Sequence, residues 1–386
     1  MFNNFFYGNP VKIFFGKGVV ERIGDKTSEY GKNVLLVTGR ESVKKIGVYS
    51  EVIESLKKNS LKIFELSGVK PSPGLEKCKE GSDICKKNNI EVVIGLGGGS
   101  VLDTAKTIAF AALYAGDLWD FFEKKREVKK ALPIISVMTV AATGSEYNNI
   151  TVIKNEKINK KESIWNENLF PKVSFLDPQL TFSVPLKYTA FGAVDIISHV
   201  LERYITNRST TLLQLRFKES LMTTVMENVE TVLKNPSNYE ARASLMWSSS
   251  LACSQMFELG NENIDIPAHT IDIELGGFYD VPHGANLAVL IPAFMMCNIE
   301  KHKSNIERFS RNVLKVGEKE KTSCLAESGI KRFRLWLKKI GCSITLKDLG
   351  YKKEDFGKIA KRVISNPYWN YDEETVVNIL EIFYED

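Results

Sequence analysis

The histidines of this chain are few, and three of them lie where they suit metal binding. Asp195 and His199 are four residues apart in an apolar segment, so a helix presents both side chains on one face. His269 lies near the start of a second helical pattern, and His283 follows a proline at the predicted start of a third. One carboxylate and three imidazoles are a ligand set that suits Fe²⁺ or Zn²⁺. The alternative is that each of these histidines is a hydrogen-bonded core or capping residue. The fourth histidine, His302, lies between two lysines and is expected to be solvated.

A run of glycines after a short apolar segment forms a candidate phosphate-binding turn. Residues 91–95 (EVVIG) predict a buried strand, and the turn after it contains Gly97, Gly98, Gly99 and Ser100. Glycines allow close approach to the backbone, and the N-terminus of the following helix offers unpaired N–H groups to an anion. We therefore expect a dinucleotide pyrophosphate here, although the sequence is neither G-x-G-x-x-G nor a Walker A motif. The alternative is a tight turn without a ligand.

A second loop with small and hydroxyl side chains follows the predicted strand at 132–137. It reads TVAATGSE and contains Thr139 and Thr143. The carboxyl ends of parallel strands line the ligand crevice of an open α/β sheet, so both threonines are candidate cofactor contacts. A polar connection without a ligand accounts for the same residues equally well.

The elements that must position these residues differ between the two halves of the chain. Apolar runs of strand length occur at 11–15, 33–37, 61–66, 91–95 and 132–137, and helical patterns lie between them at 43–58, 74–88 and 100–113. This alternation predicts an α/β domain with a parallel sheet covered by helices on both faces.

From about Ser183 onward, apolar residues recur every three or four positions, which predicts helices throughout. These helical patterns occupy 187–203, 212–233, 239–258, 266–275, 285–298, 306–316 and 331–340. We therefore predict an α/β domain over 1–182 and an all-α domain over 183–386. No flexible linker marks the junction, so we expect tight packing with a cleft between the two domains.

Composition excludes several classes of protein. Hydrophobic residues make up 44% of the 386, which is too many for a disordered chain. The net charge of +5 is spread along the sequence and argues against nucleic acid as a partner. Six cysteines without a C-x-x-C pair predict reduced thiols and a cytoplasmic protein. Neither a signal peptide nor an apolar run of transmembrane length is evident, so no membrane partner is expected.

Taken together, the motifs resemble those of the iron-containing (group III) alcohol dehydrogenases, which include butanol dehydrogenases and broad aldehyde reductases. The resemblance covers almost the whole chain. The motifs that carry it are 13–18 (IFFGKG), 97–100 (GGGS) with Asp103 and Lys106, 142–146 (ATGSE), Lys161, 176–178 (LDP), Asp195 with His199, His269, and 279–284 (YDVPHG) with His283.

The resemblance implies that the aspartate and the three histidines bind the metal and that the glycine turn holds the cofactor pyrophosphate. It also places Asp103 and Lys161 near the cofactor and the active site in the cleft between the domains. The implied reaction interconverts primary alcohols and aldehydes with NAD(P)(H). A homodimer is expected as well, and the aromatic segment 5–7 is a candidate for pairing across it.

One position departs from the family pattern. Four residues after the counterpart of His269, the family commonly has a histidine near substrate and nicotinamide, whereas this chain has Ile273. Isoleucine cannot relay a proton. An active enzyme with a pocket for bulkier apolar compounds is one reading. The alternatives are a catalytically weak or inactive dinucleotide- and metal-binding protein and, from the wider superfamily, a metal-dependent lyase or hydrolase.

Cofactor choice depends on the residues after the predicted strand at 33–37. In relatives that prefer NAD, an acidic residue there accepts hydrogen bonds from the adenosine ribose and repels a 2′-phosphate. Here Gly39 stands in place of the acid, and Arg40 and Ser42 offer contacts for a phosphate, although Glu41 lies between them. We predict NADP(H), with NAD as the alternative.

Overall fold

The computed structural model describes residues 3–207, 211–260, 265–317, 324–366 and 369–385. The chain forms two compact units. The α/β unit comprises Gly8–Val184 and Pro236–Ser254, and the helical unit comprises Pro185–Asn235 and the chain from Gln255 onward, together with the residues before Gly8. The boundary after Val184 lies two residues from the predicted boundary after residue 182. The segment around α9 (Tyr239–Ala252) belongs to the α/β unit, whereas the prediction assigned it to the helical domain. The cleft between the domains stays a prediction.

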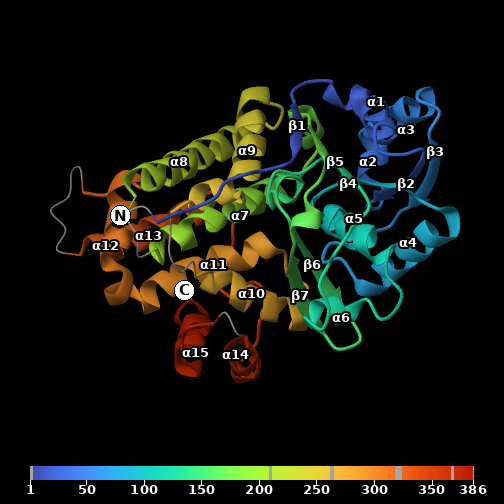
Figure 1. Ribbon diagram of the computed structural model, residues 1–386. Helices are drawn as coiled ribbons and strands as arrows, with labels where there is room; N and C mark the ends of the chain where they lie inside the picture. Colours follow the sequence, from blue (N-terminus) through green and yellow to red (C-terminus); the bar gives the residue numbers. More distant parts are fainter. Residues whose placement is uncertain (1–2, 208–210, 261–264, 318–323, 367–368, 386) are drawn as a thin grey trace. The chain divides into compact units, whose positions relative to one another are not determined.

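A six-stranded sheet forms the centre of the α/β unit (Figure 1). Its order is β1-β8-β5-β4-β2-β3, and all neighbouring strands are parallel, as predicted. The strands are β1 (Lys12–Phe15), β2 (Asn33–Thr38), β3 (Lys62–Leu66), β4 (Val92–Gly97), β5 (Ile134–Met138) and β8 (Val173–Leu176). The five predicted strands are all present, and β8 is an addition.

Helices on both faces explain why the central strands are apolar throughout. On one face, Leu35 and Val93 pack with residues of α4 (Leu75–Asn88) and α5 (Gly99–Ala111). On the other, Leu36 and Ile94 pack with residues of α1 (Ile23–Ser28) and α3 (Val48–Lys58). Successive residues of one strand thus enter opposite cores, so a doubly covered strand needs apolar residues at every position.

Several shorter elements complete the α/β unit. The helix predicted at 43–58 is two helices, α2 (Ser42–Lys45) and α3, because Gly47 between them has a φ of 83°. An antiparallel hairpin of β6 (Ile150–Asn155) and β7 (Lys160–Trp165) was not predicted. The remaining elements are α6 (Trp119–Phe122) and the 3₁₀ turns η1 (Val19–Arg22), η2 (Ser145–Tyr147), η3 (Glu167–Leu169) and η4 (Pro178–Thr181).

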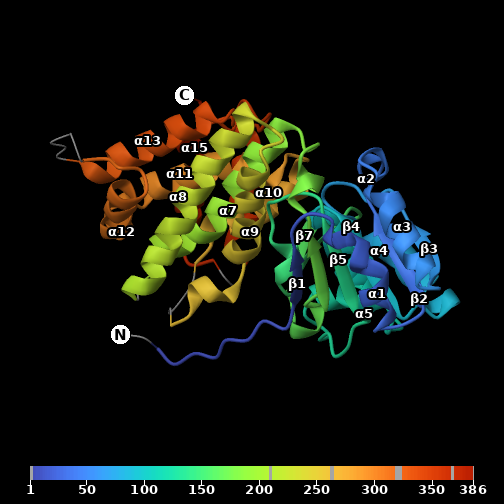
Figure 2. The same ribbon diagram turned by 90° about the horizontal axis from the view of Figure 1, so that it is seen from above.

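The helical unit is built around α7 (Leu186–Ile205), which is buried along almost its whole length. It packs against α8 (Leu212–Lys234) and α11 (His283–Cys297), and α10 (Pro267–Phe278) packs against α11 (Figure 2). The predicted helices are confirmed. The other elements are η5 (Gln255–Glu258), α12 (Ile299–Asn312), α13 (Leu325–Lys339), η6 (Lys353–Asp355), α14 (Phe356–Ile364) and α15 (Glu373–Ile382), of which the last two helices were not predicted.

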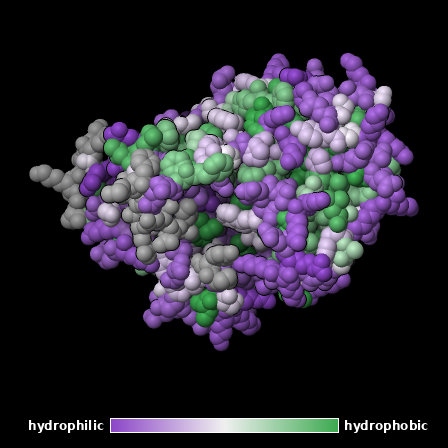
Figure 3. Space-filling model, viewed as in Figure 1, coloured by the Kyte–Doolittle hydropathy of each residue, from purple (hydrophilic) through white to green (hydrophobic). Residues whose placement is uncertain are grey.

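Surface properties bear on the remaining predictions. Within the described residues, no helix combines the length and apolar character needed to cross a bilayer. Hydrophilic side chains cover the outer helices of the α/β unit, at the right edge of Figure 3. All six cysteines are free thiols. Phe5 and Phe6 are exposed, while the homodimer and the cytoplasmic location stay predictions.

Candidate metal centre and cofactor site

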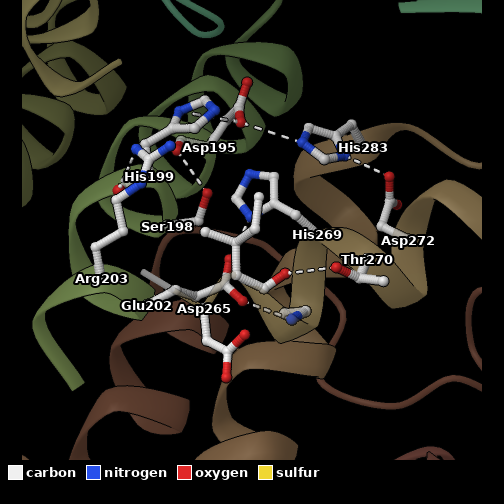
Figure 4. Close-up of polar contacts among 12 residues, drawn as sticks. Asp195, Ser198, His199, Glu202, Arg203, Asp265, His269, Thr270, Asp272 and His283 are labelled. Atoms are coloured by element: carbon white, nitrogen blue, oxygen red, sulfur yellow. Dashed lines mark hydrogen bonds and ion pairs between the residues drawn. The ribbon is translucent and has the colours of Figure 1, made fainter. Parts of the chain in front are cut away.

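Three helices bring the predicted metal ligands together. Asp195 and His199 lie one turn apart on α7, His269 is the third residue of α10, and His283 is the first residue of α11. The last two follow Pro267 and Pro282, which suit a helix start because proline lacks the N–H that would have no partner there. Figure 4 shows the three imidazole rings gathered beside the Asp195 carboxylate.

The distances among these side chains suit a single ion. His283 Nε2 lies 3.4 Å and His199 Nδ1 3.7 Å from Asp195 Oδ1. The ring of His269 has its centroid 4.9 Å from that of His199 and 5.1 Å from that of His283. Ligand atoms of Asp195, His199 and His269 all lie within 4.8 Å of one another. Donor atoms about 2.0–2.2 Å from a metal ion stand at comparable separations.

Three of the atoms that face this centre are buried without a hydrogen-bond partner among the described residues. They are Asp195 Oδ1, His199 Nδ1 and His269 Nε2. A buried polar atom without a partner costs about 1–3 kcal/mol, and a group of three in one place needs an explanation. A cation bound by these atoms supplies that explanation, so the residues present fit a divalent metal.

Carboxylates behind two of the histidines fix the direction of their rings. Glu202, whose side chain is fully buried, bonds His269 Nδ1 and also accepts from the backbone N–H of Ala268 at 2.5 Å. Asp272 Oδ2 lies 2.6 Å from His283 Nδ1. A carboxylate at Nδ1 holds the proton on that nitrogen and leaves the Nε2 lone pair for a metal. Neither carboxylate is among the site residues predicted from the sequence.

Two of the three imidazoles are neutral near pH 7, which is the form that binds a metal ion. Burial lowers the pKa of His199 and of His269, which keeps both neutral near pH 7. Burial also acts to lower the pKa of His283, but Asp272 and Asp195 outweigh it and raise that pKa to about 10. Burial would raise the pKa of Asp195, yet the neighbouring imidazoles bring it to about 2. A metal at this centre therefore has to displace a proton from His283.

On the α/β unit, packing accounts for two of the three glycines in the predicted phosphate turn. A Cβ at Gly97 would lie 2.7 Å from Val101 Cγ2, and one at Gly99 would lie 2.6 Å from Thr143 Oγ1. At Gly98, the N-cap of α5, the nearest atom would be 3.4 Å away, in Val140. The fold therefore does not require glycine at position 98, and the ligand interpretation rests most on that residue.

The topology of the sheet places the turn at a point that suits a nucleotide. After β2 the chain passes to β3 on one side, and after β3 it returns to β4 on the other side of β2. Ligands of open α/β sheets bind at such switch points, outside the carboxyl ends of the strands. The loops that follow β2 and β4 flank this point. The first holds the predicted contacts Gly39 and Arg40 and leads to Ser42, the first residue of α2. In the second, Gly98 alone separates Gly97, which ends β4, from Gly99 and Ser100, which begin α5.

The loop after β5 lies beside the glycine turn. The N–H of Thr139 donates to the carbonyl oxygen of Gly97 at 3.0 Å, and Thr143 is the residue that a side chain at Gly99 would strike. Lys106, a fully buried amine on α5, holds the far end of this loop by bonds of 2.9–3.0 Å to oxygens of Asn148 and Ile150. The structure thus brings the predicted threonines next to the predicted phosphate turn.

Asp103 and Lys161 lie farther along, where α5 meets the hairpin. Asp103 accepts from Ser145 Oγ at 3.0 Å and from the N–H of Val152 at 3.3 Å, and burial raises its pKa to about 6. Lys161, on β7, is near enough to lower that pKa. These contacts give Asp103 a structural role, and contact of either residue with a cofactor stays a prediction.

Comparisons with known proteins match the whole chain. The family pattern described as "Iron-containing alcohol dehydrogenase" matches residues 10–178, and "Fe-containing alcohol dehydrogenase family, C-terminal" matches 189–385. A probable NADH-dependent butanol dehydrogenase of Bacillus subtilis is 38% identical, over 98% of this chain and 99% of that protein. An NADPH-dependent aldehyde reductase of Escherichia coli is 29% identical, over 94% of this chain and 93% of the other.

The solved structures give the same result. The crystal structure of an NADH-dependent butanol dehydrogenase A from Thermotoga maritima has a TM-score of 0.95 and 38% identity, and covers 100% of this chain and 99% of that one. The resemblance found in the sequence is therefore confirmed. The chain belongs to the iron-containing alcohol dehydrogenase family and is an oxidoreductase of alcohols and aldehydes.

Proposed function

We propose that this protein reduces aldehydes to primary alcohols with NADPH, reversibly, and that the reaction depends on a divalent metal held by Asp195, His199, His269 and His283. The observation that carries the proposal is the group of three ligand atoms without a hydrogen bond in a buried centre backed by carboxylates. The names of the relatives, butanol dehydrogenases and an aldehyde reductase, support the substrate class.

Each unit has its own task in this proposal. When bound, the divalent metal supplies Lewis acidity toward the substrate oxygen, worth several kcal/mol. Glu202 and Asp272 keep protons on Nδ1 of His269 and His283, so that both Nε2 atoms face the centre. The backbone at Gly98 and the N-terminus of α5 bind the pyrophosphate. Holding two reactants in a productive geometry removes about 7–11 kcal/mol of a barrier.

One assay separates this function from its alternatives. The protein is stripped of metal, reloaded with Fe²⁺ or Zn²⁺, and mixed with butanal while NADPH absorbance is followed. We expect NADPH consumption that requires the metal. Tight NADPH binding without turnover on any of several aldehydes would contradict the proposal and favour the non-catalytic alternative that Ile273 suggests.

Cofactor preference is tested at Gly39, where we propose that the missing acid admits the 2′-phosphate of NADPH. A Cβ here would have only ordinary contacts, at 3.8 Å to Val101 Cγ2 and to the carbonyl oxygen of Val69, so the backbone accepts the first atom of an aspartate side chain. Placing like charges together costs several kcal/mol. We expect the ratio of kcat/KM for NADPH over NADH to fall by at least about tenfold.

The matched control is Gly39→Asn, which adds nearly the same volume without the charge. An unchanged ratio in Gly39→Asp, or an equal fall in Gly39→Asn, would show that position 39 does not read the phosphate. Four of the relatives, at 35–38% identity, are named as NADH-dependent. A wild-type preference for NADH would therefore assign the protein to their cofactor class.

Ile273 is the candidate determinant of an apolar substrate pocket. It lies one turn after His269 on α10 and is partly exposed, whereas Asp272 and Glu274 beside it are buried. Loss of a few methylenes from an apolar pocket is worth about 1–3 kcal/mol. We expect Ile273→His to lower kcat/KM for butanal about tenfold while acetaldehyde, which has less surface to bury, loses less. A rise in butanal turnover would instead show that a missing proton relay limits the native enzyme.

A further inference from the structure

A chain of three hydrogen bonds leads from His283 to a distant tyrosine. Asp272 Oδ2 lies 2.6 Å from His283 Nδ1, and Asp272 Oδ1 accepts from Asn286 Nδ2 at 2.7 Å. The amide oxygen of Asn286 in turn accepts from the hydroxyl of Tyr351 at 2.8 Å. The bonds thus connect α10, α11 and the segment before η6, all within the helical unit.

The chemistry of each member sets the direction of the chain. The Tyr351 hydroxyl donates, so the oxygen of the Asn286 amide faces the tyrosine and its NH₂ group faces Asp272. An ionised Asp272 only accepts, so the proton in its bond to His283 belongs to Nδ1 of the imidazole. His283 Nε2 then faces Asp195, 3.4 Å away, as a metal ligand requires.

The residues that make these hydrogen bonds are buried, so they have few other partners within reach. Asn286 and Asp272 are each 1% exposed and Tyr351 is 2% exposed, so water cannot readily replace a lost partner. Asn286 lies three residues after His283 on the same helix, which places both side chains over Asp272. Tyr351 is itself anchored, because its N–H donates to the carbonyl of Leu346 at 3.1 Å and its ring lies 4.5 Å from that of Tyr279.

We infer that Tyr351 and Asn286 are positioning residues for the metal: they orient Asp272 so that His283 presents Nε2 to the centre. This inference rests on the proposed metal site and extends it to two residues outside the ligand set. Loss of such an outer partner typically weakens metal binding by about 10–100-fold. The effect should decrease with distance from His283, so Asn286 should matter more than Tyr351.

The test measures metal affinity without any turnover. The full chain is freed of metal, and its dissociation constant for Zn²⁺ is determined by competition with a chromophoric chelator. We expect Tyr351→Phe to bind Zn²⁺ about tenfold more weakly than wild type, and Asn286→Leu up to about 100-fold more weakly. The visible absorption of bound Co²⁺, which reports ligand geometry, should change in both variants.

Tyr279→Phe is the matched control. It removes the hydroxyl of the ring next to Tyr351. That hydroxyl donates to Asp355 at 2.5 Å and takes no part in the hydrogen bonds that lead to His283. We expect its Zn²⁺ affinity and Co²⁺ spectrum to equal those of wild type. A merely structural role for Tyr351 would lower the melting temperature and leave the affinity and the spectrum unchanged.

The outcomes separate this inference from the proposed function. Wild-type affinity in both folded variants, Tyr351→Phe and Asn286→Leu, would overturn the inference and leave the metal site standing. A wild-type protein that binds no Zn²⁺, Fe²⁺ or Co²⁺ would overturn both. Metal binding that weakens as expected in the variants, in a protein that turns over no aldehyde, would support the inference and overturn the dehydrogenase.

Discussion

His269→Ala should abolish aldehyde reduction and metal binding together. His269 offers a buried, unpartnered Nε2 to the centre, and its Nδ1 is the partner of the buried Glu202 carboxylate. Removing the ring deletes one ligand and leaves that carboxylate next to an unfilled space. Metal stabilisation of the transition state is worth several kcal/mol, and about 1.4 kcal/mol corresponds to a factor of ten. We therefore expect kcat/KM for butanal to fall by at least about a thousandfold.

His302→Ala provides the control for this prediction. His302 lies on α12 and contacts Phe294 and Tyr371, away from the cluster, so its loss should leave metal content and turnover unchanged. Metal content is measured by elemental analysis of the purified proteins, beside the NADPH assay. Full turnover in His269→Ala at wild-type metal content would show that this histidine is not a ligand.

Gly98→Ala should weaken cofactor binding while the fold remains intact. The added methyl has its nearest neighbour 3.4 Å away in Val140, which needs little adjustment, but it stands at the N-cap of α5 where the pyrophosphate is expected. An anion at a partly buried helix N-terminus gains up to about 2 kcal/mol. Losing the whole of that gain corresponds to about 30-fold weaker NADPH binding, which a fluorescence titration measures.

The control for Gly98→Ala is the same substitution at Gly357, a glycine with open space around it. A Cβ at Gly357, on the exposed face of α14, would meet no atom within 4 Å, so Gly357→Ala should leave NADPH binding unchanged. Unaltered NADPH affinity in Gly98→Ala would reduce the glycine turn to a feature of packing. The close contacts at Gly97 and Gly99 would then be its whole explanation.

Prediction of the strands succeeded where an apolar run marks them in the sequence and failed where polar or charged residues interrupt the run. The strands β2, β4 and β5 are apolar runs buried on both faces, which the sequence shows directly. Strand β8 is only four residues long and contains Ser174, which bonds Ser136 on the neighbouring strand at 2.6 Å. The hairpin strand β7 is half-exposed and rich in charged residues, so no apolar run marks it.

Prediction of the site succeeded for residue types and failed for partners. The spacing of Asp195 and His199 predicted one helix face, but nothing in spacing alone shows that α10 and α11 meet α7 there. Glu202 lies three residues after His199 but bonds His269, and Asp272 lies three residues after His269 but bonds His283. Both bonds join different helices, so spacing along one helix reveals neither pair. The bond from Tyr351 crosses a long stretch of sequence and has no local signature.

A metal titration tests the central claim most directly. Metal-free protein receives increasing amounts of Zn²⁺ or Fe²⁺ while the rate of NADPH oxidation by butanal is recorded at each step. Four ligands around a single centre predict a rate that starts near zero and reaches its plateau at about one ion per chain, with no such rise in His269→Ala. A full rate before any metal is added would contradict the account. So would the absence of NADPH oxidation after one ion per chain has bound.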